Sequence, residues 1–466
     1  MICYLLLSAL TAAAAFAAKS RRTVNAIAAI FYAIQALLPV WIVATGRMGS
    51  HDCRVFVFDE TGVLFHTLSA VVSAFVFGHS VRYFRNESPA RYKQYMALLM
   101  LLTCAIAGVY FADNIAVTWI FLETTTLCAA GLIYHRGTEQ ALEATWKYIF
   151  VCSTGIAAAY LGILLLCSVA ADGSLSYEAL AHNVAHGNPT YLKTAFVLIL
   201  CGYSCKMEIF PLYTIGVDAN FAAPAPATAM ISTALVNAGF VAIFRVYKVM
   251  AASEAFEWIR HVMLLVGLLS LAIGAMFMRR TNNYKRFLSY STVENMGIAA
   301  IGLGLGGIGI WAAVFHVMCH TLVKSSLMLQ AAVLRHVYNG YRINRIGDYI
   351  SINSVGAIGF IVGSVAVLAF PPSPLFVSEL MVMKQAVADG NWAVLATVVL
   401  LLCIVVYSFC SRIVRLCYQP NQDPVSLSGS ECRGAWSALV LLIAAMAVGV
   451  WQPEALRALI DSIVNI

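Results

Sequence analysis

Long apolar runs, separated by short polar loops, dominate the chain. Fourteen of these runs are long enough to cross about 30 Å of hydrocarbon at about 1.5 Å per helical residue. The predicted spans cover residues 2–18, 25–46, 62–82, 94–112, 114–134, 146–170, 192–213, 222–248, 259–278, 287–307, 309–334, 353–386, 393–417 and 434–452. The pattern predicts an all-α membrane protein with about fourteen transmembrane helices, and an even number places both termini on one side.

Two of the predicted spans are interrupted by proline. Span 192–213 carries Lys206 in its middle and Pro211 shortly after it, and span 353–386 contains the segment PPSP, which starts at Pro371. Proline removes a backbone donor and clashes with the preceding turn, so we expect both helices to break. Freed backbone is tolerated at membrane depth only inside protein or beside a cavity. A broken helix beside a buried charge is typical of an ion path.

Composition agrees with this interpretation and excludes other classes of protein. Of the 466 residues, 61% are apolar and only 11% are charged, which excludes a water-soluble enzyme. The net charge of +7 comes from basic residues in short loops, so nothing indicates nucleic-acid binding. The 13 cysteines are scattered through apolar runs without CxxC spacing, and we expect neither a metal site nor a cofactor.

The basic loops also predict the orientation of the chain. Lysine and arginine cluster in the loops that follow odd-numbered spans, which should therefore be cytoplasmic; Lys248 and Arg260 are exceptions. We expect a multi-pass protein of the cell (inner) membrane with both termini on the outer, periplasmic side. Residues 171–191 look like a short amphipathic segment on that side, and the first run, residues 2–18, looks like an uncleaved span.

Spans 4 to 8 match spans 9 to 13 in their polar residues, which predicts an internal repeat. Residues 94–248 would form the first five-helix unit and residues 259–417 the second. Because each unit has five spans, the second must enter the membrane with inverted topology. Residues 1–93 would add three helices in front, and residues 418–466 a C-terminal helix.

Two charged residues of the first unit lie deep in apolar spans. Glu123 sits in AVTWIFLETTTLCAAGL, and Lys206 sits in the span that Pro211 interrupts. Intramembrane charges are costly and usually mark pathways, although hydrogen bonding between helices is the alternative for Glu123. The two residues could pair, and moving them apart would release a proton from the lysine.

His316, His320 and Lys324 recur every four residues in WAAVFHVMCHTLVKSSLML. Residues at this spacing share one helical face, so the span presents a polar stripe. A proton relay fits this stripe better than a metal or haem site, because no Glu follows the first His as in HExxH and histidines four apart do not oppose each other across one iron.

Three further residues belong to the candidate proton path. Glu379 follows the proline-rich break directly, whereas Glu294 lies about two turns from the cytoplasmic end of its span and is either a port residue or a helix partner. Lys147 is either a relay group or an anchor at the membrane interface, because long cationic stems reach toward water near helix ends.

Several ordered segments give the sequence its resemblance to a known family. They are WIFLE, the Lys206 segment ending in FPLY, DANFAAPAPATAMIS, YKRFLSYSTVENMG, FHVMCHTLVKSSLML and PPSPLFVSEL. Together they resemble the antiporter-like membrane subunits of respiratory complex I, multisubunit cation/proton antiporters and group 4 membrane-bound hydrogenases, and most of all the hydrogenase-4 component F branch.

The resemblance implies two inverted half-channels joined by a central chain of charged residues that carries protons. Glu123 and Lys206 would form the modulating pair, the stripe of His316, His320 and Lys324 the central relay, and Glu379 the end of the second half-channel. Redox chemistry would take place in partner subunits.

This sequence departs from the family pattern in the first half-channel. Many relatives carry a second lysine in the eighth span, where this chain offers Asn237. The frequent FPFHTWLPDAH reads FPLYTIGVDAN here, which loses both histidines and keeps Asp218. We therefore expect a weakened or differently wired first half-channel.

The sequence thus predicts a subunit that conducts protons, or alternatively sodium ions, in a redox-driven membrane complex. Its expected partners are the other membrane and peripheral subunits of a hydrogenase or quinone-oxidoreductase complex and the lipid bilayer, and by itself it should catalyse no redox step. The alternatives are a subunit of a multisubunit Na+/H+ antiporter, a membrane protein that binds haem, and a non-conducting scaffold.

Overall fold

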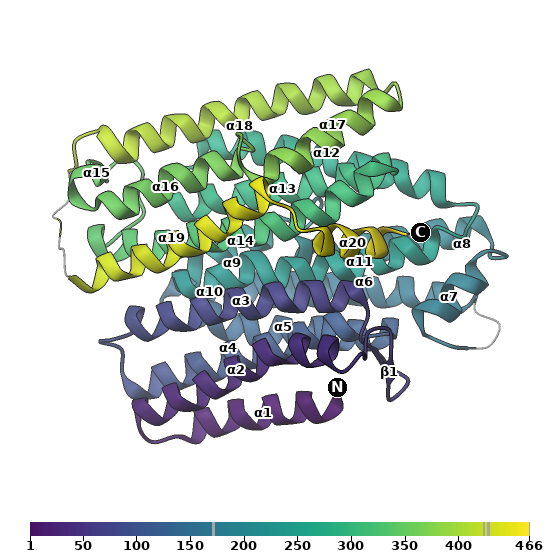
Figure 1. Cartoon of the computed structure of the whole chain (residues 1–466), viewed down its shortest axis with the longest axis horizontal. Helices are drawn as coiled ribbons and strands as arrows, with labels where there is room; N and C mark the ends of the chain where they lie inside the picture. Colours follow the sequence, from purple (N-terminus) through teal and green to yellow (C-terminus); the bar gives the residue numbers. More distant parts are fainter. Residues whose placement is uncertain (170–172, 423–424, 426–428, 466) are drawn as a thin grey trace.

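The computed structural model describes residues 1–169, 173–422, 425 and 429–465, and most of them are helical. The long helices run side by side along one common direction (Figure 1). The first part of the chain forms α1 (Ile2–Ala17), α2 (Arg21–Ala44), β1 (His51–Asp52), β2 (Phe56–Val57), α3 (Glu60–Tyr83), α4 (Pro89–Phe111), α5 (Ile115–Tyr134) and α6 (Glu139–Cys167).

The middle of the chain contains shorter elements between the long helices. They are α7 (Tyr177–Val184), α8 (Pro189–Met207), α9 (Thr214–Ala222), α10 (Ala225–Met230), the π-helix η1 (Ile231–Leu235), α11 (Val236–Met250), α12 (Phe256–Arg280), α13 (Tyr284–Leu305) and α14 (Ile308–Tyr338). The last part forms α15 (Tyr349–Ile352), α16 (Ser354–Val367), α17 (Pro374–Ala388), α18 (Trp392–Tyr418), α19 (Gly429–Val450) and α20 (Glu454–Val464).

The helices confirm a multi-pass membrane protein. Nine helices of the described part are long and apolar enough to cross a membrane, and the bent pair of α19 and α20 would make a tenth. Each of the fourteen predicted spans coincides with a helix or with consecutive helical pieces. Some of these, including α1 and α16, are apolar but shorter than a full span. The number of fourteen crossings therefore stays a prediction.

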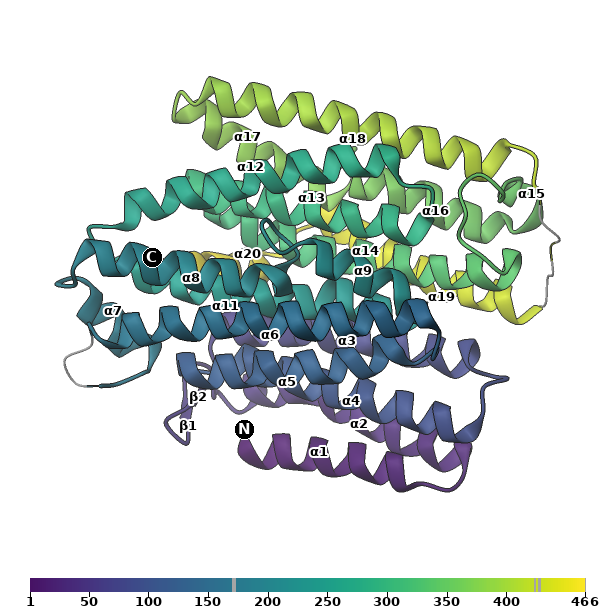
Figure 2. The ribbon, with the colours of Figure 1, turned by 180° about the vertical axis from the view of Figure 1, so that it is seen from behind.

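Helix α14 lies in the middle of the bundle. Figure 1 shows α19 and α20 in front, whereas Figure 2, seen from behind, shows α6, α8 and α12 in front. Helix α14 packs between these faces, against α3, α10, α13, α16, α17 and α19. All of its most apolar stretch is buried. The polar residues in that stretch of α14 are therefore removed from both lipid and water.

The first predicted break lies between α8 and α9. Helix α8 ends at Met207, because Glu208 takes a left-handed conformation with φ 57°. Two side chains then satisfy freed backbone donors: Ser270 of α12 accepts from Phe210 N at 2.9 Å, and Ser204 accepts from Leu212 N at 3.4 Å. The backbone beyond the break is thus held by protein groups, as membrane depth requires.

The second predicted break lies between α16 and α17. Helix α16 ends at Val367, and Ala369 has a positive φ of 52°. Ser373 then caps α17 by accepting from Phe376 N at 3.2 Å. Helix α19 crosses close to this break: a side chain at Gly449 would place its Cβ 2.5 Å from Pro374 N. Both interruptions that the prolines predicted are confirmed.

Two features of the fold were not predicted. The C-terminal segment contains α20 after α19, bent by 79° from it, where the sequence predicted a single helix. The amphipathic segment predicted for residues 171–191 contains the short helix α7 and only the first three residues of α8; residues 171 and 172 lie outside the described part.

Contacts between loops divide the bundle into two ends. Arg21 donates to the carbonyls of Arg85 and Phe84, Arg136 donates to the Tyr83 hydroxyl, and Asn283 pairs with Arg342. These loops form one end, which we call the basic end. At the opposite end the N-terminal ammonium pairs with Asp52, and Lys248 donates to the carbonyl of Ile463 at 2.9 Å. The described chain termini therefore share one end of the bundle.

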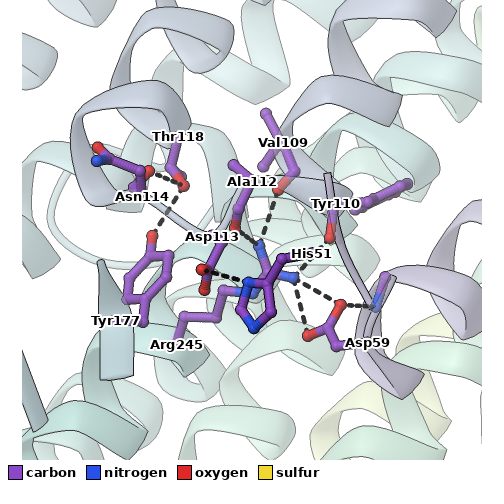
Figure 3. Close-up of polar contacts among 11 residues, drawn as sticks. His51, Asp59, Val109, Tyr110, Ala112, Asp113, Asn114, Thr118, Tyr177 and Arg245 are labelled. Carbon is purple, nitrogen blue, oxygen red and sulfur yellow. Dashed lines mark hydrogen bonds and ion pairs between the residues drawn. The ribbon is translucent and has the colours of Figure 1, made fainter. Parts of the chain in front are cut away.

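Arg245 ties three helices together at the end opposite the basic end (Figure 3). Its guanidinium lies 2.9 Å from both carboxylate oxygens of Asp59, the N-cap of α3, and donates to the carbonyls of Val109, Tyr110 and Ala112, where α4 ends. We call this arrangement the Arg245 clamp. The guanidinium supplies donors to carbonyls that the end of α4 leaves without helical partners. The Arg245 side chain is only 7% exposed.

His51 and Asp113 lie beside the clamp, 3.2 Å apart. Burial raises the pKa of the Asp113 carboxyl above its usual range, although the charges of His51 and Arg245 oppose the shift. Tyr177 of α7 bonds to the Thr118 hydroxyl at 2.8 Å and so fastens α7 to α5 in the same network.

Replacing Arg245 tests the clamp. Arg245→Gln leaves the Asp59 carboxylate and several carbonyls without a cation, and removing one partner of a buried ion pair costs about 3–5 kcal/mol. We expect a loss of about 3 kcal/mol in the free energy of unfolding, measured in mixed detergent and SDS micelles. Arg280→Gln, at an exposed position, serves as the control. Equal stability of the two variants would contradict the role of the clamp.

Candidate functional site

The charged residues of the interior begin with the partly buried Glu123 on α5 and the buried Lys206 on α8. The Lys206 ammonium donates to the Thr126 hydroxyl at 2.8 Å, and that hydroxyl donates to Glu123 Oε2 at 3.1 Å. Glu123 with Lys206 is not among the ion pairs that the described residues form. The acid and the base that the sequence singled out are thus brought together, but a single hydroxyl stands between them.

Neighbouring helices hold this group in place. From α6, Ser153 donates to Glu123 Oε1 at 2.9 Å, and the Tyr148 hydroxyl accepts from Lys206 at 3.3 Å. Helix α11 passes so close to the end of α8 that a Cβ at Gly239 would lie 2.5 Å from Met207 N. Lys206 is only 1% exposed, so its charge depends on these protein partners.

Glu208 is a buried charged residue that the sequence analysis did not select. Its left-handed backbone at the end of α8 turns the carboxylate inward, where it is 2% exposed. Asn220 of α9 donates to Glu208 Oε1 at 2.9 Å, while Oε2 has no hydrogen-bond partner within the described ranges. Helix α9 contacts the carboxylate at Gly216, where a Cβ would lie 2.5 Å from Glu208 Cδ. The sequence offered only one signal for it, an acid between a buried lysine and a helix-breaking proline, and that signal does not give the direction of the side chain.

The predicted stripe on α14 lies entirely in the interior. His316, His320 and Lys324 are each 0% exposed. His316 Nδ1 lies 2.9 Å from the Ser378 hydroxyl of α17, whereas His316 Nε2, both ring nitrogens of His320 and the Lys324 ammonium have no hydrogen-bond partner among the described residues. Lys324 interacts electrostatically with the carboxylates of Glu294 and Glu208.

Glu294 and Glu379 continue the series on α13 and α17. Glu294 is 1% exposed, accepts a hydrogen bond from Asn295 and interacts electrostatically with both Lys324 and Glu379. Glu379 is 7% exposed and lies just beyond the second helix break. The acid of each broken helix therefore lies within electrostatic reach of the charges around α14.

Asn237, which the resemblance sets against a second lysine of many relatives, is buried between α11 and α14. It donates through Nδ2 to Thr321 Oγ1 of α14 at 2.8 Å. One turn away, Ser325 donates to the Thr233 hydroxyl of η1 at 3.2 Å. The uncharged amide thus joins α11 to the helix that carries the stripe.

Two polar residues from the sequence analysis lie away from this group. Lys147 is half exposed and pairs with Glu143 on the same helix face. Asp218 pairs with Arg286 at 3.0 Å on the way to the basic end. Lys147 is in the surroundings expected of an interface anchor.

Together the buried residues form a series that crosses five helices, α5, α8, α14, α13 and α17. We call it the buried charged axis, and it comprises Glu123, Lys206, Glu208, Lys324, His320, His316, Glu294 and Glu379. It contains four glutamates and four basic side chains, and Lys324 interacts electrostatically with Glu208 and Glu294. Such an arrangement can hold and exchange protons, because titratable groups buried inside a membrane bundle usually lie on ion pathways.

Comparison with known proteins identifies the family. Residues 112–405, which include the whole buried charged axis, match the family described as NADH:quinone oxidoreductase/Mrp antiporter, TM. The chain belongs to this family. Its resemblance to antiporter-like membrane subunits is thereby confirmed.

One relative and two solved structures illustrate what the chain is similar to. The hydrogenase-4 component F homolog of Methylacidiphilum infernorum is 26% identical over 346 residues, which cover 72% of this chain and 73% of that protein. A subunit of an archaeal membrane-bound sulfane sulfur reductase superposes with a TM-score of 0.86 at 23% identity, covering 100% of this chain and 96% of that one. A chain of the Mrp complex from Dietzia sp. DQ12-45-1b gives 0.80 at 19% identity, covering 100% and 97%. The two structural likenesses establish the fold.

Removing the Thr126 hydroxyl tests whether it bridges Lys206 and Glu123. Thr126→Val leaves the Lys206 ammonium and Glu123 without their shared partner, and an unsatisfied buried polar group costs about 1–3 kcal/mol. We expect a loss of that size in the free energy of unfolding, and Thr126→Ser should restore most of it. Thr124→Val, on the exposed face of the same helix, is the matched control. If both valine variants are equally stable, the bridge does not hold the two charges.

Proposed function

We propose that the chain is a proton-translocating membrane subunit of a redox-driven complex of the hydrogenase-4, formate-hydrogenlyase or NADH:quinone oxidoreductase type. The observation that carries this proposal is Lys324, a lysine buried in the central helix that has no hydrogen-bond partner in the described part of the chain and lies within electrostatic reach of Glu208 and Glu294. A fully buried and unpartnered cation is costly to maintain, so a function is needed to account for it.

Protons would pass along the buried charged axis between its acids and bases. Glu208, two residues beyond Lys206 and within electrostatic reach of Lys324, would link the two lysines. The unpartnered nitrogens of His316 and His320 extend the route toward Glu294 and Glu379. Water that solvates these unpartnered atoms would complete the hydrogen-bonded chain.

The Thr126 bridge supplies a switch. An ammonium held near a carboxylate keeps its proton, and one that is separated from the carboxylate in an apolar site releases it. Changing the distance across the Thr126 hydroxyl would therefore load or unload Lys206. The work required is modest, because one charge moved across 100 mV needs about 2.3 kcal/mol.

The same proposal includes the finer organisation of the chain. Residues 94–248 and 259–417 would form two inverted five-helix units within a fourteen-helix protein, preceded by residues 1–93 and followed by residues 418–466. In support, a broken helix occupies the fourth place of each unit, at α8 and α9 in one and at α16 and α17 in the other. Inverted repeats with such breaks commonly place ion sites near the bilayer midplane.

Charge distribution supports an orientation in the cell (inner) membrane. The loops of the basic end would face the cytoplasm, in agreement with the positive-inside rule. Both termini would then face the periplasm. Electrons would be transferred in partner subunits, and this chain would contribute the ion path.

Ion pumping by the intact complex in proteoliposomes tests the proposal. We expect Lys206→Met and Glu379→Gln each to lower redox-driven proton uptake by at least tenfold, because each removes a titratable group from the path. Lys384→Met, an exposed lysine on the same helix as Glu379, is the control. Lys147→Met distinguishes a relay from an anchor and should leave pumping unchanged.

Two outcomes would contradict the proposal in different ways. Undiminished pumping in both axis variants would make this subunit a scaffold. Sodium-dependent exchange without redox turnover would favour an antiporter subunit, an alternative that the similarity to an Mrp complex supports.

Glu208 deserves a separate test because the sequence alone did not select it. Glu208→Gln keeps the hydrogen bond from Asn220 and removes the charge, so the break between α8 and α9 should persist while proton uptake falls by at least tenfold. Glu178→Gln, an exposed acid on α7, is the control. Normal uptake by Glu208→Gln would limit Glu208 to a structural role at the end of α8.

A further inference from the structure

A cavity of about 500 Å³ opens at the basic end of the bundle. It lies where α5 ends, α6 and α13 begin and α14 ends, and the loop of residues 339–345 closes one side. Arg136, Arg335, Arg342 and Arg345 all line it. The cavity is separate from the buried charged axis, none of whose members lines it.

The positive charge of the arginines is not balanced by any carboxylate among the described residues that line the cavity. No aspartate or glutamate of the described residues lines it, and Arg136, Arg335 and Arg342 form no ion pair with a described carboxylate. Lys285 lies fully buried beneath it, donates to the carbonyls of Phe221 and Ala223, and is repelled by Arg136 and Arg335. Several cations gathered at short range are unfavourable without an anion among them.

Two helix N-termini also face the cavity. Thr138 caps α6 by accepting from Ala141 N at 3.1 Å, and Asn283 caps α13 by accepting from Lys285 N at 3.0 Å. Thr138, Ala141 and Asn283 line the cavity. The positive ends of two long helix dipoles therefore add to the arginine charges, and helix N-termini commonly bind phosphate.

Tyr341 provides a buried donor in the same wall. Its side chain is 5% exposed, and its ring lies 5.6 Å from the Lys285 ammonium and 5.9 Å from the Arg335 guanidinium. Its hydroxyl lies near Arg136 but has no hydrogen-bond partner of good geometry. The cavity thus offers a neutral donor as well as cations.

We propose that this cavity binds a phosphate-bearing anion. The arginines present planar forks that match phosphate oxygens, and the helix N-termini add backbone donors. The cavity lies at the ends of membrane-spanning helices, at the level of lipid headgroups, where basic pockets bind anionic headgroups. The phosphate comes either from an anionic phospholipid or from free phosphate, which have the same recognition chemistry.

Binding to the purified full-length chain distinguishes these sources. The chain in neutral detergent is titrated with phosphatidylglycerol, with phosphatidylcholine and with sodium phosphate at constant ionic strength, and bound lipid is counted by native mass spectrometry alongside the thermal unfolding midpoint. The test variant is Arg335→Gln with Arg342→Gln. Its control is Arg22→Gln with Arg280→Gln, two exposed arginines at the same end.

We expect phosphatidylglycerol to bind the wild type and the control equally, and to bind the test variant about 25-fold more weakly, at about fivefold for each arginine lost. Phosphatidylcholine should not compete with phosphatidylglycerol for the cavity. If sodium phosphate alone raises the unfolding midpoint, and does so only with the arginines intact, the source is free phosphate and the proposal still holds. If neither anion distinguishes the test variant from the control, the proposal is wrong.

The single variant Arg342→Gln controls for misfolding of the double variant, because the Arg342 side chain is exposed on the loop. It should keep the unfolding midpoint of the wild type without added anion and lose about fivefold in affinity. Unchanged affinity in this folded variant would likewise overturn the proposal.

Discussion

A charged side chain in the apolar interior of a membrane bundle is stable only if protein groups replace the water it has lost, and this constraint shapes the centre of the molecule. Lys206 satisfies it with the Thr126 and Tyr148 hydroxyls, and Glu208 satisfies it in part with Asn220. Lys324 does not satisfy it through any hydrogen bond of the described residues. The interior therefore contains charged groups with hydrogen bonds, such as Lys206, and a charged group without any from the described residues, Lys324. Lys324 lies on α14, the helix that most of the bundle surrounds.

The same constraint governs the backbone. A helix can be interrupted at membrane depth only where other groups take over its hydrogen bonds. Ser204 and Ser270 do so after α8, and Ser373 does so before α17. Both interruptions place an acid next to the gap, Glu208 in one and Glu379 in the other. Each break in a helix thus allows a carboxylate to face the interior of the bundle.

Sequence reasoning recovered the helical class, the two breaks and most of the buried charges, because apolar length, proline and isolated charge act locally along the chain. It did not recover the contacts between distant helices. Thr126 is one of three consecutive threonines, and only the packing of α8 against α5 and α6 selects it as the bridge. Glu208 was passed over because its inward direction depends on a left-handed backbone, which no pattern of residue types prescribes. The cavity at the basic end needed the meeting of four helices, whereas the sequence showed only scattered arginines in loops predicted to be cytoplasmic.

The π-helix η1 has a consequence for the register of α11. A π turn holds one residue more than an α turn, so the residues that follow it are rotated relative to a continuous α-helix. Since each residue of an α-helix turns by about 100°, converting η1 to α geometry would rotate the rest of α11 by about that angle against α10. Asn237 would then leave Thr321, and Gly239 would leave the end of α8. The extra residue therefore fixes which face of α11 meets the central helix.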